Sequence, residues 1–172
     1  MSALRITNDG WLVAGWRRFP CALGRAGIVA NKREGDGATP AGRWPLREIL
    51  YRPDRITRPV SRLPVSAIAP DAGWCDDPSH PDYNRRVKLP HAARCETLWR
   101  DDGLYDLLCV IGYNDAPVIA GRGSAIFMHV AAPRLAPTAG CVALAPIDLR
   151  AVLAETGPDD RIAIGTSAQT AA

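Results

Sequence analysis

The sequence has no long hydrophobic run. No segment approaches the roughly 18 to 20 uninterrupted apolar residues that cross a bilayer, so we expect no membrane span. The first ten residues also lack the basic and then apolar layout of a signal peptide. The sequence therefore indicates a soluble protein that carries no visible export signal.

The sequence also lacks a large excess of basic charge and a nucleotide-binding loop. The chain has 21 Lys and Arg residues against 18 Asp and Glu residues, a net charge of +3, and its basic residues are scattered. Nucleic-acid-binding proteins gather basic residues into a patch or stripe, so we expect no nucleic-acid partner. The glycine-rich segment 35–42 fits neither the Walker A spacing nor the G-x-G-x-x-G fingerprint, and we interpret it as a tight turn.

The cysteines follow no metal-binding pattern. There is no C-x-x-C pair and no histidine at the spacing of a metal ligand, so we expect no metal site and no cofactor. His80 and His91 lie in segments rich in Gly, Pro and Asp, and we expect them to be structural or solvent-exposed. Because five is an odd number, complete pairing would still leave one thiol free among Cys21, Cys75, Cys95, Cys109 and Cys141.

The 172 residues suffice for one domain with its own hydrophobic core. Short apolar runs separated by turn residues are typical of antiparallel β-structure, and they predict strands at 11–16, 21–23, 27–30, 44–46, 63–68, 105–112, 124–130, 141–144 and 161–164. We expect a mainly β single domain over residues 1–166, a bent sandwich or mixed sheet with one or two short helices. Residues 167–172 form a polar tail that we expect to be disordered.

Two helices are predicted from apolar residues at helical spacing. Spacings of i, i+3 and i+4 indicate a helix over 94–100 with a buried stripe of Cys95, Leu98 and Trp99. A second helix is expected to begin at Pro146, which suits a first turn, and to end by Gly157, with a stripe of Leu149, Val152 and Leu153.

The segment 70–90 is too rich in breaker residues to predict regular structure. It nevertheless carries two large aromatic residues, Trp74 and Tyr83. Long loops inside compact domains are more often functional than decorative. Here we favour the simpler interpretation that the two rings pin the loop to the body of the domain.

The residues that suggest chemistry lie between 127 and 144. His129 stands at the end of a predicted strand, and a proline-rich loop then leads to Thr138-Ala-Gly-Cys141. A neighbouring imidazole can take the proton of a thiol and generate the nucleophilic thiolate. Gly140 permits a sharp turn whose amides can face an oxyanion. On spacing alone, the alternative of a core histidine and a core thiol stays open.

These residues resemble the signature of the YkuD-like L,D-transpeptidase catalytic domain, a family of peptidoglycan-modifying cysteine enzymes. The signature is a His on a strand, a variable loop, then Ser/Thr-x-Gly-Cys and an apolar residue, matched here by His129, Thr138, Gly140, Cys141 and Val142. The segment Thr39-Pro-Ala-Gly42 resembles the family's upstream Thr-Pro-x-Gly turn. The resemblance covers roughly residues 31–165 and is closest to a compact, single-domain branch.

The resemblance implies a role for each matched residue. Cys141 would be the nucleophile, and His129 the base that activates it and later protonates the leaving amine. The amides from Ala139 to Cys141 would stabilise the oxyanion, which gives Gly140 a catalytic position and places Thr138 and Ala139 against the substrate. In the family a backbone carbonyl commonly orients the histidine.

Three departures from the family pattern bear on substrate binding. The usual His before the Gly is Ala139, the usual Arg or Asn after the Cys is Ala143, and the loop from His129 to Cys141 is short. The missing polar residue at 143 would be replaced by an arginine able to grip a carboxylate, and the candidates are Arg134, Arg122 and Arg43. Two further substrate contacts are expected in a flap over the acyl site, from Tyr113 and Asn114.

Family enzymes cleave an L,D peptide bond in a stem peptide, hold the acyl group as a thioester, and pass it to a diaminopimelate amine. The resemblance therefore implies a monomeric, cofactor-free L,D-transpeptidase whose partners are peptidoglycan stem peptides, with β-lactams as acylating agents of Cys141. The short loop favours 1-3 cross-links from L-Ala, and 3-3 cross-links are the other version. This substrate predicts a periplasmic or cell-wall location, in conflict with the lack of a visible signal peptide.

Three alternatives remain on the sequence alone. Water can attack the same thioester, which would make the protein an L,D-carboxypeptidase or amidase. The losses at Ala139 and Ala143 are also compatible with a catalytically dead peptidoglycan-binding module, although His129 and Cys141 are both retained. The last alternative is a redox or structural cysteine protein with no connection to the cell wall.

Overall fold

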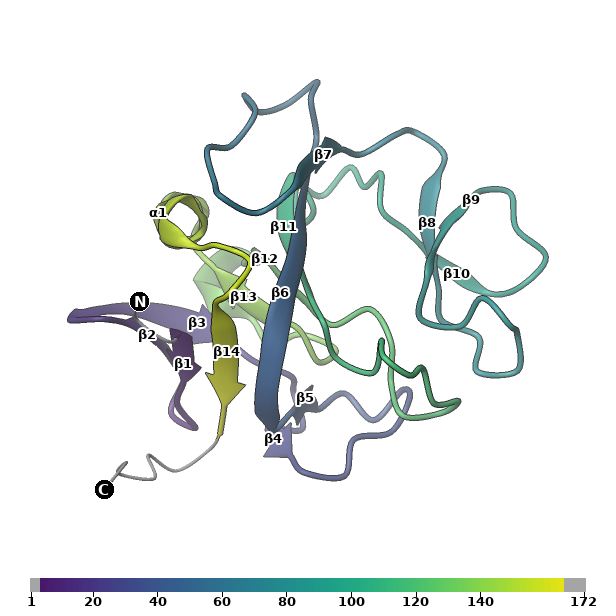
Figure 1. Cartoon of the computed structure of the whole chain (residues 1–172), viewed down its shortest axis with the longest axis horizontal. Coiled ribbons are helices and arrows are strands. Elements are labelled where there is room, and N and C mark those ends of the chain that lie inside the picture. Colours follow the sequence, from purple (N-terminus) through teal and green to yellow (C-terminus); the bar gives the residue numbers. More distant parts are fainter. Residues whose placement is uncertain (1–3, 166–172) are drawn as a thin grey trace.

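The computed structural model describes residues 4–165, and its main element is a sheet of nine strands (Figure 1). In spatial order these are β11 (Leu107–Ile111), β12 (Phe127–Val130), β13 (Val142–Leu144), β3 (Arg17–Ala22), β2 (Trp11–Ala14), β1 (Leu4–Ile6), β14 (Arg161–Ile164), β6 (Gly42–Tyr51) and β7 (Val65–Ala67). The ten-residue strand β6 also pairs with β11, which closes the sheet into a barrel-like structure. Closure leaves β11 with a partner on both sides, whereas β7, which pairs with β6 alone within residues 4–165, remains an edge strand.

The hydrophobic core lies on both faces of β11 and β12. All five residues of β11 are buried, and alternate side chains point to opposite faces. Leu107, Cys109 and Ile111 join a large cluster, to which the helix α1 (Pro146–Glu155) also contributes. Leu108 and Val110 join a smaller cluster that contains Phe127 and Cys141. The expected mainly β single domain is thus confirmed, and so is the helix after residue 146.

The helix expected over 94–100 is wrong. Cys95–Thr97 is the strand β10, which pairs antiparallel with β8 (Ala72–Cys75), and β9 (Arg86–Lys88) completes a three-stranded sheet. Three apolar positions within seven residues fit either structure, and pairing with β8 decides between them. The expectation of no regular structure over 70–90 is wrong for the same reason. Trp74 and Tyr83 are both buried, as expected.

The remaining elements are short. β4 (Ile28–Val29) and β5 (Thr39–Pro40) form a parallel pair, and the 3-10 turn η1 (Pro133–Leu135) lies between β12 and β13. Among residues 4–165, no helix has the length and apolar character needed to cross a membrane. The tail predicted at 167–172 lies outside the described residues.

Arg52 anchors the segment that follows β10. Its side chain is 3% exposed, and its guanidinium lies 3.7 Å from the centroid of the Trp99 ring. It donates two hydrogen bonds to Asp54 and one to the carbonyl of Arg100. These contacts fix the backbone around residue 100 to the main sheet.

We predict that Arg52→Ala lowers the free energy of unfolding by about 2 to 3 kcal/mol, because it removes buried packing and leaves a carbonyl unpaired. Urea denaturation measures the loss. The more exposed Arg55, which pairs with Asp101 and Asp106, is the matched control, with a loss of about 1 kcal/mol or less for Arg55→Ala. Equal losses in the two variants would contradict the anchoring role.

Candidate active site

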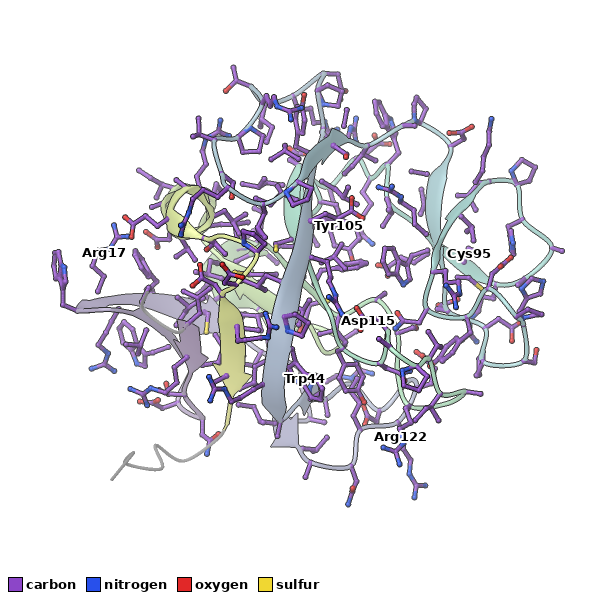
Figure 2. All side chains as sticks on the ribbon, viewed as in Figure 1. Arg17, Trp44, Cys95, Tyr105, Asp115 and Arg122 are labelled. Atoms are coloured by element: carbon purple, nitrogen blue, oxygen red, sulfur yellow. The ribbon has the colours of Figure 1, made fainter. Side chains whose placement is uncertain are left out.

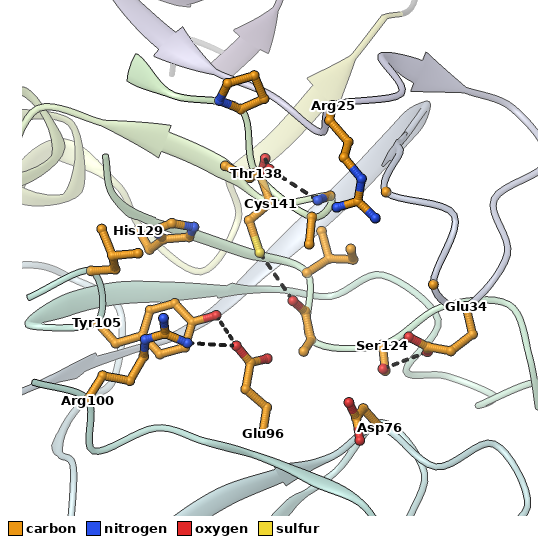
Figure 3. Close-up of a pocket in the computed structure, with 18 of the residues that line it drawn as sticks. Arg25, Glu34, Asp76, Glu96, Arg100, Tyr105, Ser124, His129, Thr138 and Cys141 are labelled. Carbon is orange, nitrogen blue, oxygen red and sulfur yellow. Dashed lines mark hydrogen bonds and ion pairs between the residues drawn. The ribbon is translucent and has the colours of Figure 1, made fainter. Parts of the chain in front are cut away.

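A cavity of about 630 Å³ opens between the ends of β12 and β13 and the sheet of β8, β9 and β10. Figure 3 shows the Cys141 side chain near its centre, with the His129 ring on one side. Five of the candidate site residues named from the sequence line this cavity. They are Cys141, His129, Gly140, Thr138 and Ala139. The fold thus brings together the residues of the Cys-His signature.

His129 lies in β12, and Cys141 directly precedes the neighbouring parallel strand β13. His129 lies opposite Ala143 in the register of β12 and β13, and the amide of Phe127 donates to Cys141 Sγ over 3.3 Å. Residues two apart on a strand share a face, so His129 is on the face of Phe127, and Cys141 is on the face of Ala143. The pairing therefore presents imidazole and thiol on one side of the sheet.

Thr138 organises the turn that leads to Cys141. Its hydroxyl donates to the Cys141 carbonyl over 2.7 Å and accepts the Gly140 amide over 3.1 Å. Gly140 has φ of +142°, and a Cβ at this position would lie 2.7 Å from the carbonyl oxygen of Ala38. Glycine is required here both by the backbone conformation and by this close approach.

The Thr-Pro-x-Gly segment supports the same turn. Thr39 is fully buried, and its hydroxyl accepts the amide of Gly24 over 2.8 Å. Gly24 forms a β-bridge with Thr138, whose backbone also bonds to Leu23 and Arg25 over 2.9 Å each. The upstream motif therefore holds the strip of backbone against which the Thr138 turn is built.

The thiol of Cys141 is neutral at rest. It is buried and donates to the carbonyl of Ala125 over 3.3 Å. Burial is the main cause that raises the pKa of Cys141 to about 12, and the negative charge of Glu96 adds to it. At neutral pH the group is a thiol, and it becomes a strong nucleophile only when a base removes its proton.

The imidazole of His129 is neutral as well. Burial lowers the pKa of His129 from its ordinary value of 6.5. Nδ1 lies 2.8 Å from the carbonyl oxygen of Val130, which can only accept a hydrogen bond, so Nδ1 carries the proton. The Tyr105 ring packs edge-on against the imidazole at 5.2 Å. The His129 imidazole is therefore held as the tautomer whose Nε2 can accept a proton.

Charged side chains form the wall that faces Cys141 (Figure 3). Glu96 accepts a hydrogen bond from the Tyr105 hydroxyl and lies 3.6 Å from Arg100 Nη1. Burial raises the pKa of Glu96, against the effect of Tyr105 and Arg100. Other charged residues lining the cavity are Glu34, Asp76, Arg25, Lys32 and Arg94. A cavity with both signs of charge suits a ligand that carries carboxylate and ammonium groups.

Tyr113 and Asn114, expected to contact substrate, lie outside the lining of this cavity. Tyr113 is buried, and its hydroxyl donates to the carbonyl of Arg122. The Asn114 amide donates to the carbonyls of Ile119 and Gly123, over 3.0 and 2.9 Å. Both side chains therefore shape the turn between β11 and β12.

The three arginines named as candidate carboxylate ligands also lie outside the lining. Arg43, Arg122 and Arg134 are exposed, and Figure 2 shows Arg122 at the periphery of the molecule. The arginines that do line the cavity are Arg25, Arg94 and Arg100. No local sequence pattern indicates these three arginines, because each belongs to a separate segment and only the tertiary fold brings them to the cavity.

The chain matches the model of the YkuD family, the L,D-transpeptidase catalytic domain, over residues 2–164. Since this match spans almost the whole chain, the protein belongs to that family, whose members act on peptidoglycan stem peptides. No curated protein and no solved structure gives a significant match.

We predict that Gly140→Ala disrupts the turn before Cys141. The variant has to adopt a left-handed backbone and to displace the Ala38 carbonyl, so the free energy of unfolding should fall by about 3 kcal/mol or more. Gly121→Ala is the matched control, because Gly121 also has positive φ, +77°, but a Cβ there meets nothing within 4 Å. Its cost should be about 1 to 2 kcal/mol. Equal melting curves for the two variants would contradict a steric requirement at 140.

We predict that Glu96→Gln makes Cys141 more reactive, because it removes a negative charge that raises the thiol pKa. Alkylation of Cys141 by iodoacetamide should accelerate roughly two- to tenfold at about pH 8, since one pKa unit changes the thiolate fraction tenfold. Peptide mapping by mass spectrometry separates this site from the partly exposed Cys95. Glu48→Gln, outside the cavity lining, is the control and should leave the rate unchanged.

Proposed function

We propose that the protein is a peptidoglycan L,D-transpeptidase that acts through an acyl-enzyme on Cys141. The observation that supports this most strongly is a buried thiol and a neutral imidazole on one face of one cavity, with Nδ1 of His129 bonded to the Val130 carbonyl. That carbonyl takes the orienting role that a backbone carbonyl commonly has in the family.

In the proposed acylation step, Cys141 turns from the carbonyl of Ala125 toward His129 as substrate enters. Nε2 of His129 accepts the thiol proton while Sγ attacks the carbonyl carbon of the donor peptide. The amides of Ala139 and Cys141 receive the oxyanion, because the Gly140 amide already donates to Thr138. His129 then gives the proton to the leaving amine, and a thioester remains on Cys141.

In the proposed transfer step, a side-chain amine of diaminopimelate attacks the thioester. His129 removes the amine proton, the new peptide bond forms, and the departing sulfur takes the proton back from His129. The acidic wall of Glu34, Asp76 and Glu96 favours an ammonium-bearing acceptor. Arg25 and Arg100 provide positions for a carboxylate of the same stem peptide.

The proposed linkage is 1-3, between L-Ala of the donor and diaminopimelate of the acceptor. Eleven residues separate His129 from Cys141, and the structure folds them into η1 and the Thr138 turn. A loop this short leaves a compact rim around the thiol, which suits a donor held close to the start of its stem. A 3-3 linkage requires room for a longer donor.

The decisive experiment incubates muropeptides that carry diaminopimelate with the wild-type protein and with Cys141→Ala. We expect cross-linked dimers from the wild type only, and mass spectrometry with fragmentation should locate an L-Ala to diaminopimelate bond. His129→Gln should also lose the dimer while keeping the fold, since it removes only the base.

Other products have distinct meanings. Shortened monomers formed by the wild type alone would replace transpeptidation by hydrolysis of the same thioester. A dimer with a 3-3 bond would overturn only the linkage. Unchanged muropeptides with both proteins would contradict the proposed activity and favour a binding module.

A further inference from the structure

A second cluster of nucleophilic side chains lies at the wall of the cavity, in the sheet of β8 and β10. Cys75 and Cys95 are directly opposite each other in the antiparallel register, and both are free thiols. The next pair along carries the hydrogen bond from the Asp76 amide to the Arg94 carbonyl, at 3.2 Å. Cys75 and Cys95 therefore occupy a non-hydrogen-bonded pair, where side chains approach most closely.

His91 joins the two thiols from the loop that precedes β10. One ring nitrogen of His91 and the sulfurs of Cys75 and Cys95 all lie within 4.8 Å of one another. Cys75 is fully buried, and the side chain of His91 is 16% exposed. The three donors are thus gathered in a largely enclosed place, although 15 residues separate Cys75 from His91. This spacing is why the sequence predicts no metal site.

We propose that Cys75, Cys95 and His91 bind a zinc-like divalent cation. Two thiolates and one imidazole are donors that zinc prefers, and bond lengths near 2.3 Å to sulfur and 2.0 Å to nitrogen put the donors about 3.5 Å apart. Since the donors lie within 4.8 Å of one another, the side chains need to close by at most about 1.3 Å. Binding releases the two thiol protons, and the thiolate charges neutralise the cation.

Asp82 and His80 surround the third ligand. Asp82 Oδ2 lies 3.1 Å from His91 Nε2, and the Ala93 amide donates to Nδ1 over 3.1 Å. Ligation through Nδ1 displaces that amide and keeps Asp82 as the carboxylate partner that ligating histidines usually have. His80 and Asp82 lie on the Nε2 side of His91, within 4.8 Å of it, so a cation bound to Nδ1 takes water in its remaining coordination position.

The cation would stiffen one wall of the active-site cavity. Asp76, Arg94, Cys95 and Glu96 all line that cavity, and Glu96 is the neighbour of a proposed ligand. A cation that joins β8, β10 and the loop carrying His91 would hold these side chains in place. The proposed metal site is independent of the proposed transpeptidase activity, since none of the metal ligands takes part in the proposed reaction.

The test uses the full chain with Cys141→Ala, which removes the active-site thiol from the readout. The protein is reduced, stripped with a chelator and titrated with Co²⁺, then with Zn²⁺. We expect one equivalent of Co²⁺ to produce sulfur-to-cobalt charge-transfer absorption, Zn²⁺ to displace it, and the melting temperature to rise with either metal.

Variants of the ligands separate this site from incidental binding. Cys95→Ser and His91→Gln should weaken Co²⁺ affinity by about 100-fold or more, since even supporting residues of metal sites account for 10- to 100-fold. Cys21→Ser, which removes another buried thiol far along the chain in β3, should leave affinity unchanged. Melting curves without metal verify that each variant is folded.

Three results would overturn the proposal. They are no charge-transfer absorption in the reduced protein, absorption that survives in Cys95→Ser, and a Cys75–Cys95 disulfide whose reduction yields no metal binding. The last result would identify the pair as a cross-strand disulfide, which this geometry also permits.

Discussion

The parallel pairing of β12 with β13 is the constraint on which the cavity depends. It places His129 and Cys141 on one face, but it also requires the chain to enter β13 through a sharp turn. That turn is possible because Gly140 has no side chain to meet the Ala38 carbonyl, and because the Thr138 hydroxyl ties both of its ends. The Thr39 side chain then holds Gly24 against Thr138 from behind. Two motifs that are 99 residues apart, measured from Thr39 to Thr138, are therefore parts of one structure.

Burial sets the protonation states of both central residues. It raises the pKa of Cys141 and lowers that of His129, so each favours its neutral form and no ion pair is formed at rest. A buried thiolate-imidazolium pair would have to recover the cost of desolvating two charges. Glu96 opposes the thiolate, whereas Lys32 and Arg100 favour it. In the proposed reaction the nucleophile is thus generated only with substrate present, and the resting thiol resists oxidation, which follows thiolate character and exposure.

The elements with a distinct local sequence pattern were predicted correctly. The helix after Pro146 and the strand 161–164 were predicted closely, because their apolar periodicity and flanking turn residues are distinct. The helix expected over 94–100 failed because a short apolar pattern cannot report the pairing of Cys95 with Cys75. Likewise the Cys-His signature indicated His129 and Cys141, but Val130 acts through a backbone carbonyl that no residue type encodes. Glu96 reaches the cavity through the pairing of β10 with β8, and Arg100 through the segment that Arg52 anchors, and one sequence carries no local signal for either contact.

The position of Ala143 explains why the charges of the cavity come from other segments. Ala143 is fully buried, paired on one side with His129 and on the other with Ala22. Because Ala143 is fully buried, a long polar side chain at 143 would have to displace the side chains packed around it. The cationic groups instead project from Arg25 and Arg100, on opposite sides of the cavity from each other in Figure 3. A carboxylate of the proposed substrate would therefore be held at the walls of the cavity, by side chains from segments other than β13.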